Sequence, residues 1–179
     1  MPRYIALLRA INVGGHTVKM DKLRKLFEEM DFANVETFIA SGNVIFEAKE
    51  KDAAKLEKNI EAHLEKALGY AVGTYLRTPD ELKAAADHEP FPRADGDGTY
   101  VIFVRDEPGA DAKKRLAALE SDDDRFAVHA REVYWWRRNG RMSDSLITGP
   151  QLAKAIGQPG TNRNLTTVRK MAAKYAAKE

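Results

Sequence analysis

Residues 3–15 read RYIALLRAINVGG, and this stretch decides the fold of the first half of the chain. Apolar residues at positions 5, 7, 8, 11 and 13 predict a β-strand over residues 3–13. The pair Gly14-Gly15 then ends it, since residues without a Cβ adopt backbone angles that a strand cannot use. The chain therefore begins with a strand that runs into a tight turn.

Strand and helix patterns alternate after this turn. Apolar residues at helical spacing predict helices over residues 18–30 and 56–68. Strands are predicted over residues 34–40, 44–48 and 71–76, with a turn at Ser41-Gly42-Asn43 between the first two. The order βαββαβ is that of a ferredoxin-like sheet with helices on one face.

A stretch rich in proline and glycine, residues 90–98, follows a short linking helix that begins at the capping box of residues 78–81. The pattern then begins again with a strand, a helix and a hairpin, and it finishes on helices instead of a strand. We therefore predict an α+β fold of two ferredoxin-like (βαββαβ-type) subdomains with antiparallel sheets. The first covers residues 1–90, and the second covers residues 91–179 and ends in helices.

Composition excludes several classes of protein. The chain of 179 residues has no Cys, which removes disulfides, thiolate nucleophiles and Cys-based metal sites. Its longest clean apolar runs, residues 4–8 and 100–104, are far shorter than the roughly 20 residues that span a bilayer. We expect a cytoplasmic protein without a membrane partner.

The near-neutral total charge conceals two unlike halves. Residues 1–90 carry 13 basic and 15 acidic side chains, whereas residues 91–179 carry 16 and 12. Residues 125–179 alone carry 11 basic and 3 acidic side chains. This basic C-terminal third favours anionic partners if it forms one surface.

The turn after the first predicted strand is the first candidate site. Backbone N–H groups around Gly14 and Gly15 can converge on an anion at a helix start, with Arg9 supplying a guanidinium and Asn12 an amide. A tight strand-to-helix turn is the alternative interpretation. Neither nucleotide-binding glycine motif is present, so no cofactor is predicted.

Two further polar turns are candidates. Ser41 and Asn43 can bond a ligand beside the sheet edge, or they can simply form a hairpin loop. Residues 160–164, GTNRN, precede the terminal helix. Thr161, Asn162 or Asn164 can be its N-cap, or Thr161, Arg163 and Asn164 can form a second anion site with the guanidinium of Arg163. Arg169 and Lys170, within the helix, would strengthen the positive field of that site.

Residues 134–138, YWWRR, resemble a stacking platform with basic flanks. Strand alternation sends Tyr134 and Trp136 to one face and Trp135 to the other, so one Trp belongs to the core. No nucleophile motif or metal-ligand spacing accompanies these residues, and residues 122–124, DDD, are expected in an exposed loop. Catalysis is therefore not favoured.

Five stretches together resemble the DUF1697 family of uncharacterised bacterial proteins. They are residues 4–15 (YIALLRAINVGG), 20–27 (MDKLRKLF), 35–46 (VETFIASGNVIF), 132–134 before the Asn139-Gly140 turn, and 161–168 (TNRNLTTV). The resemblance implies two ferredoxin-like α+β subdomains and carries over no activity. This chain departs from the family pattern at Ala10, where the family has Gly, and at Leu165, where it has an aromatic residue.

The leading functional hypothesis is a binding protein for a small anionic or phosphorylated ligand, held in a cleft between the subdomains. Nine residues would line this cleft: Arg9, Asn12, Gly14, Gly15, Ser41, Asn43, Thr161, Arg163 and Asn164. They occur at strand ends, turns and a helix start, where rigid elements present polar groups to solvent. The alternatives are nucleic-acid binding through the basic C-terminal third, an enzyme without a recognisable nucleophile–base pair, and a non-catalytic structural or interaction module.

Overall fold

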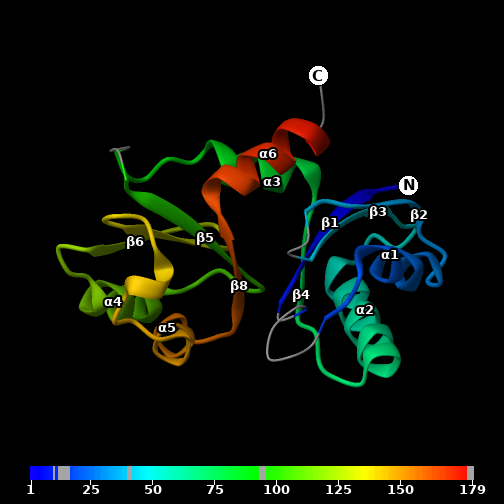
Figure 1. Ribbon diagram of the computed structural model, residues 1–179, viewed down its shortest axis with the longest axis horizontal. Coiled ribbons are helices and arrows are strands. Elements are labelled where there is room, and N and C mark those ends of the chain that lie inside the picture. Colours follow the sequence, from blue (N-terminus) through cyan, green and yellow to red (C-terminus); the bar gives the residue numbers. More distant parts are fainter. Residues whose placement is uncertain (10, 12–16, 40–41, 93–95, 177–179) are drawn as a thin grey trace. The chain divides into compact units, whose positions relative to one another are not determined.

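The computed structural model describes residues 1–9, 11, 17–39, 42–92 and 96–176 (Figure 1). The chain divides into two compact units, Met1–Leu82 with Lys174–Glu179, and Lys83–Ala173. The boundary that composition predicts near residue 90 falls within the second of these units. In the described part of the chain, no helix combines the length and the apolar character needed to cross a membrane.

The first unit contains the predicted βαββαβ order. Its elements are β1 (Arg3–Leu8), α1 (Met20–Glu28), β2 (Ala33–Thr37), β3 (Asn43–Glu47), α2 (Ala53–Leu68) and β4 (Thr74–Arg77). The strands form one antiparallel sheet in the order β2-β3-β1-β4, which is the ferredoxin-like arrangement.

Strand β1 is shorter than the predicted strand over residues 3–13. It ends at Leu8, after which Arg9 lies in a bend and Ile11 in a turn, while residues 10, 12 and 13 lie outside the described residues. Its neighbours explain the difference, because Leu7 pairs with Asn43, the first residue of β3, and Leu8 with Thr74, the first residue of β4. Strand pairing ends there, so β1 ends at Leu8 even though the apolar pattern of the sequence continues to residue 13.

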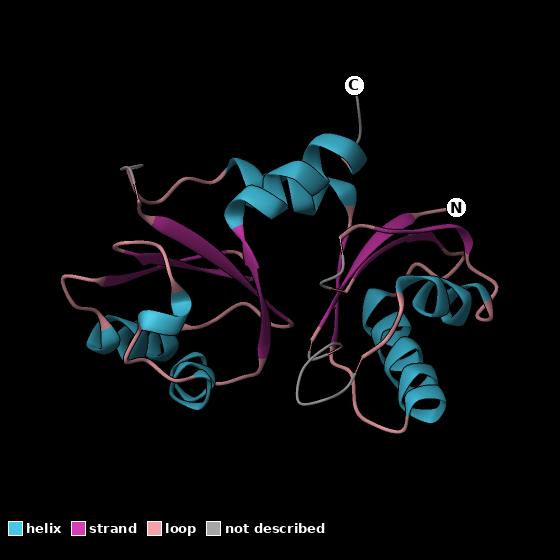
Figure 2. Ribbon diagram, in the orientation of Figure 1, coloured by secondary structure: helices cyan, strands magenta, loops and turns pink. Residues whose placement is uncertain are grey.

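Helices α1 and α2 cover one face of the first sheet, as Figure 2 shows. Alternate residues of β1, among them Ala6 and Leu8, pack with Phe27 of α1 and with Ile60 and Leu64 of α2. The strand therefore supplies every second residue and the helices supply one stripe each, which is the pattern that the sequence predicts.

The linking helix α3 (Pro79–Asp87) begins at the predicted capping box. The Thr78 hydroxyl accepts from the Glu81 backbone N–H at 3.1 Å, and the Glu81 carboxylate accepts from the Thr78 N–H at 3.0 Å. These two bonds satisfy two backbone N–H groups at the start of the helix, which confirms that part of the prediction.

The second unit repeats the arrangement of the first. Its further elements are β5 (Gly98–Val104), α4 (Ala110–Leu119), β6 (Asp124–His129), β7 (Glu132–Arg137), the 3₁₀ turn η1 (Met142–Asp144), α5 (Gly149–Ile156), β8 (Gly160–Asn164) and α6 (Leu165–Tyr175). The antiparallel sheet has the order β6-β7-β5-β8. Two ferredoxin-like α+β units with antiparallel sheets are thus confirmed.

Strand β8 was not predicted from the sequence. The stretch GTNRN was expected to lead directly into the terminal helix, and the second unit was expected to finish without a strand. It is a polar strand that pairs with β5, and its buried positions alternate at Thr161 and Arg163. Burial at every second position is the strand period, carried here by side chains that apolar periodicity does not detect.

The second sheet is covered by helices on the face that carries Val133 and Trp135. These residues pack with Leu116 of α4 and with Leu152 and Ile156 of α5. Tyr134 points to the opposite face, where its hydroxyl donates to the Ala85 carbonyl of α3 at 2.7 Å. The side-chain alternation predicted for β7 is therefore confirmed.

Candidate functional site

The structure describes two of the site residues predicted in the first unit, Arg9 and Asn43. The other four lie outside the described residues: Asn12, Gly14, Gly15 and Ser41. Arg9 is exposed, and its backbone N–H donates to the Gly73 carbonyl at 2.8 Å. Asn43 is fully buried, and its Nδ2 donates to the Phe38 carbonyl at 2.9 Å. Asn43 thus stabilises the turn between β2 and β3, whereas Arg9 faces solvent.

Thr161 and Arg163 are buried residues of β8. Arg163 Nη1 donates to the Thr161 hydroxyl and to the Asn162 carbonyl, both at 2.8 Å. Burial lowers the pKa of Arg163 to about 10. Both acceptors belong to β8 itself, so these two bonds hold the guanidinium of Arg163 within its own strand. Such internal bonding is what we expect if Arg163 has a structural role.

Asn164 is exposed and is the last residue of β8, directly before α6. Its Oδ1 accepts from the Thr166 backbone N–H at 2.8 Å. That bond satisfies one of the free N–H groups at the helix start, as an N-cap does, so the N-cap interpretation is confirmed for Asn164.

Asn164 also lines an open cavity of about 620 Å³, which we call the Trp136 cavity. Four parts of the second unit form it: residues 89–92 after α3, residues 96–99 at the start of β5, Trp136 of β7, and residues 164–166 with Arg169 of α6. The cavity therefore brings the YWWRR segment together with the start of the terminal helix, two features that sequence patterns identified separately.

Trp136 supplies an aromatic surface to the cavity. It is half-buried, whereas Trp135 on the opposite face is 4% exposed and belongs to the core. The Arg125 guanidinium lies 5.9 Å from the Trp136 ring centroid, and the Phe91 ring centroid lies 6.4 Å away. A single accessible indole with a cationic neighbour suits one flat ring rather than a run of stacked bases.

Arg169 supplies the positive charge of the cavity. Its Nε donates to the Ala86 carbonyl of α3 at 3.3 Å, and its Nη2 forms an ion pair with the Glu89 carboxylate. The Arg169 side chain is 28% exposed and that of Glu89 is 48% exposed. The guanidinium is thus oriented by α3 but still reached by solvent.

The described lining also holds a second carboxylate. Asp97 Oδ1 accepts from the Asn139 backbone N–H at 3.2 Å, which ties the start of β5 to the turn after β7. Among the lining residues that the structure describes, Glu89 and Asp97 oppose Arg169 in charge. The cavity is therefore polar and of mixed sign.

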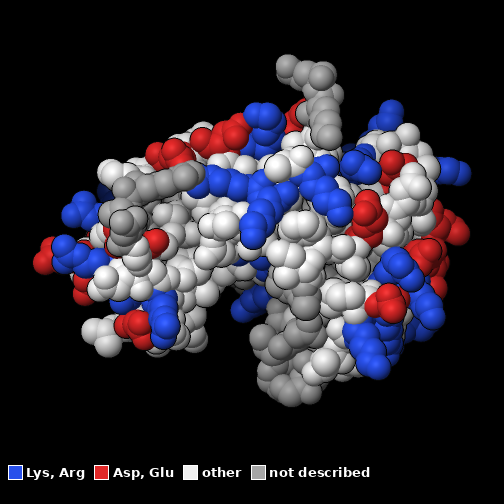
Figure 3. All heavy atoms as spheres, turned by 45° about the horizontal axis from the view of Figure 1, so that its top comes forward, with Lys and Arg blue, Asp and Glu red and all other residues white. Residues whose placement is uncertain are grey.

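The basic C-terminal third does not present all its charges to solvent. Arg137 and Arg163 are buried, and Arg169 is paired with Glu89. Figure 3 shows basic side chains gathered near the centre of the face that it displays, with acidic side chains beside them. The charge that this third offers to an anionic partner is therefore smaller than its sequence count.

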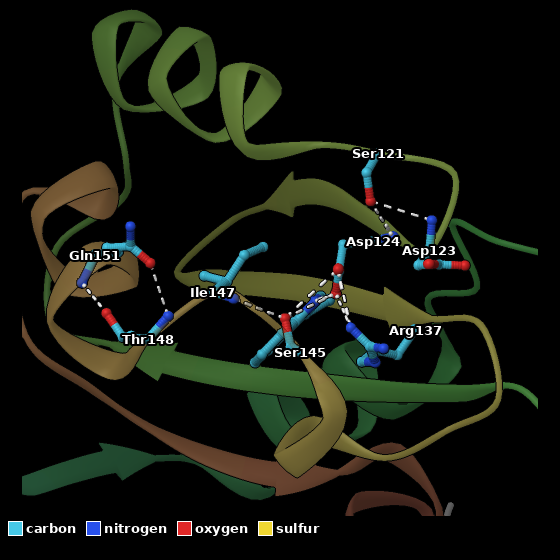
Figure 4. Close-up of polar contacts among 9 residues, drawn as sticks. Ser121, Asp123, Asp124, Arg137, Ser145, Ile147, Thr148 and Gln151 are labelled. Atoms are coloured by element: carbon cyan, nitrogen blue, oxygen red, sulfur yellow. Dashed lines mark hydrogen bonds and ion pairs between the residues drawn. The ribbon is translucent and has the colours of Figure 1, made fainter.

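A second polar cluster surrounds Asp124, the first residue of β6 (Figure 4). Its carboxylate accepts from Arg137 Nη1 at 2.9 and 3.0 Å and from Trp135 Nε1 at 2.8 Å. The Ser145 hydroxyl lies 3.4 Å from Oδ1. The expectation of an exposed loop is therefore wrong for Asp124, because the hairpin register places it opposite Arg137. The cluster holds the chain after β7 against the sheet.

His88 lies next to the end of α3 and stacks on His129 of β6, with ring centroids 4.1 Å apart. Burial, and to a lesser extent the charge of His129, lower the pKa of His88. Across the described residues, no three His, Cys, Asp or Glu side chains lie close enough together to hold a metal ion.

Comparison with known proteins adds a family and a fold. A family model described as "Protein of unknown function (DUF1697)" matches residues 1–134. The solved structure of the conserved bacterial protein SP0830 from Streptococcus pneumoniae is similar, with a TM-score of 0.74 and 23% sequence identity over 98% of each chain. No match is found among curated proteins. At that identity the structural likeness establishes the fold alone.

Proposed function

The chain belongs to the DUF1697 family, whose description assigns no activity, and we propose from its geometry that it binds a small ligand with a flat ring and an anionic group. The Trp136 cavity is the proposed site. One observation carries the proposal: a half-buried indole and an oriented guanidinium line the same open cavity. This site lies within the second unit and differs from the ligand cleft that the sequence predicts between the subdomains, which stays a prediction.

Trp136 is the proposed surface for the ring. Its neighbour Trp135 packs in the core, whereas Trp136 is half-buried and lines the cavity. Stacking of a base on an aromatic side chain contributes about 1–3 kcal/mol. A cavity of about 620 Å³ is within the range of small-molecule sites, which accommodates a nucleoside monophosphate or a similar phosphorylated heterocycle.

Arg169 is the proposed partner of the anionic group. A planar guanidinium binds carboxylate or phosphate through two parallel N–H groups. Asn164 and Thr166 line the same end of the cavity at the start of α6, where the helix dipole adds partial positive charge. Asn164, one of the nine residues predicted to line a ligand cleft, is part of the lining of the Trp136 cavity.

Calorimetric titration with adenosine 5′-monophosphate, adenosine and inorganic phosphate tests the proposal. We expect the monophosphate to bind more tightly than either fragment, because only it uses both Trp136 and Arg169. Trp136→Leu and Arg169→Gln should each weaken binding about tenfold, the equivalent of about 1.4 kcal/mol.

Lys170→Gln is the matched control, since it removes one positive charge from the same helix at an exposed residue outside the cavity lining. It should leave the affinity within about twofold. Equal losses in Arg169→Gln and Lys170→Gln would refute a specific site, and so would the absence of any binding by a folded wild-type protein.

Nucleic-acid binding through residues 125–179 is the competing hypothesis. It predicts affinity for an oligonucleotide that falls steeply with salt and is reduced by Lys170→Gln as well as Arg169→Gln. The same variants therefore separate a phosphate-tracking surface from a cavity for one small molecule.

A further inference from the structure

The ion pair between Arg169 and Glu89 lies in the wall of the Trp136 cavity. A glutamate carboxylate and a phosphate present similar oxygens to a guanidinium, so both compete for the same N–H groups. The position in which Arg169 would receive an anionic ligand is thus already taken by a side chain of the same unit.

We propose, resting on the function proposed above, that Glu89 is an internal competitor that a ligand's anionic group displaces from Arg169. The carboxylate keeps the guanidinium in place while the cavity is empty. Binding exchanges one anion for another, and the cost of breaking the internal pair is subtracted from the affinity.

The exposure of the pair permits this exchange. The Glu89 side chain is 48% exposed, so its carboxylate can turn into water without leaving a buried charge behind. Half-exposed ion pairs contribute little to stability, which makes the internal contact easy to replace. The second anchor of Arg169, the bond from Nε to the Ala86 carbonyl, leaves the guanidinium oriented during the exchange.

The same arrangement sets the class of ligand. A displaced Glu89 is still attached to the wall, and Asp97 lines the cavity as well. Additional phosphates would therefore meet two carboxylates and a single guanidinium among the described lining residues. We expect a preference for one phosphate group, with adenosine 5′-monophosphate bound more tightly than adenosine 5′-triphosphate.

Glu89→Gln tests the proposal because it keeps the size of the side chain and removes its charge. Calorimetric titration should show adenosine 5′-monophosphate binding about fivefold more tightly to Glu89→Gln than to wild type. The preference over the triphosphate should shrink in this variant. Asp87→Asn is the matched control, since this exposed residue pairs with Lys83 at 2.5 Å and does not line the cavity.

The outcomes separate this inference from the function on which it rests. Tighter binding by Glu89→Gln than by wild type, with little change in Asp87→Asn, supports it. Unchanged or weaker binding by Glu89→Gln, with wild-type binding that depends on Trp136 and Arg169, overturns the inference and leaves the binding function intact. Equal gains in affinity in Glu89→Gln and Asp87→Asn would overturn the inference, because they would show an effect of net charge alone. The absence of any binding would overturn both the inference and the binding function.

Discussion

Replacing Asp124 by Asn is expected to destabilise the second unit strongly. The substitution keeps the shape of the side chain and removes the charge that faces Arg137 at 2.9 Å. Both side chains are buried, 7% exposed for Asp124 and 9% for Arg137, so water does not replace the lost partner. No bond from Arg137 Nε is found among the described residues, which makes Asp124 the main compensation for this guanidinium.

The magnitude follows from that burial. Removing one partner of a buried ion pair costs about 3–5 kcal/mol, because the other charge is left uncompensated. In Asp124→Asn one amide oxygen replaces the two carboxylate oxygens that accept from Arg137 and Trp135. The variant therefore loses a hydrogen bond as well as the charge, and we expect the loss of stability to lie within this range.

Urea unfolding followed by tryptophan fluorescence measures the effect. Both Trp residues of the chain are in the second unit, so their emission reports on that unit. Asp123→Asn is the control, because Asp123 is exposed and is expected to change stability by less than about 0.5 kcal/mol. The double variant Asp124→Asn/Arg137→Met should recover part of the loss. A loss of stability below about 1 kcal/mol in Asp124→Asn would refute the reasoning, and so would equal losses in Asp124→Asn and the control Asp123→Asn.

Two further perturbations test other parts of the fold. A Cβ at residue 160 would lie 2.8 Å from Ile102 Cγ2, so Gly160→Ala should destabilise the β5–β8 pairing by about 1–3 kcal/mol in the same urea assay. Gly149→Ala is the control and should be nearly neutral, because a Cβ at residue 149 would have no atom within 4 Å. The pKa of His88 is lowered from 6.5, so the unfolded chain binds the proton more tightly and stability should fall as the pH drops below about 6.5. Urea midpoints between about pH 7.5 and pH 5 should show this fall, and His88→Gln should reduce it; an unchanged pH dependence in that variant would show that His88 is not its source.

The first unit could be predicted in detail because its patterns are apolar and local. Residues 4–8 and 44–46 alternate between the two faces of the sheet, and α2 ends at Leu68 as predicted, before Gly69 at a φ of 84°. The helix begins at Ala53, three residues earlier than predicted, because the Asp52 side chain caps it by accepting from the Lys55 N–H. Each of these signals comes from neighbouring residues, which a sequence shows directly.

Strand β8 and the first residues of β6 were not predicted, because polar side chains occupy buried positions there. Strand β8 buries Thr161 and Arg163, and β6 begins with the buried Asp124. The first unit ends on a strand, so a repeat of its order was the available signal for β8. Ser121 was the available signal near the start of β6, where its hydroxyl accepts from the Asp124 N–H at 3.2 Å. Periodicity of hydrophobic residues does not register either one.

The candidate site depends on long-range contacts. Trp136 and Asn164 were identified from separate segments, but only the sheet order and the course of α6 bring them into one cavity. Glu89 carried no signal beyond its place beside a proline-rich stretch, since its meaning comes from Arg169, far along the chain. Residue types were predictable from sequence, and their juxtaposition was not.

The most direct measurement follows the two indole N–H signals in a ¹H–¹⁵N spectrum during titration with adenosine 5′-monophosphate. The chain has only two Trp residues, and Trp136→Leu assigns them. The proposed site predicts that the Trp136 signal moves with saturation, while the signal of Trp135, bonded to Asp124 at 2.8 Å, stays in place. A stationary Trp136 signal under conditions where calorimetry detects binding would contradict the proposal that the Trp136 cavity is the ligand site.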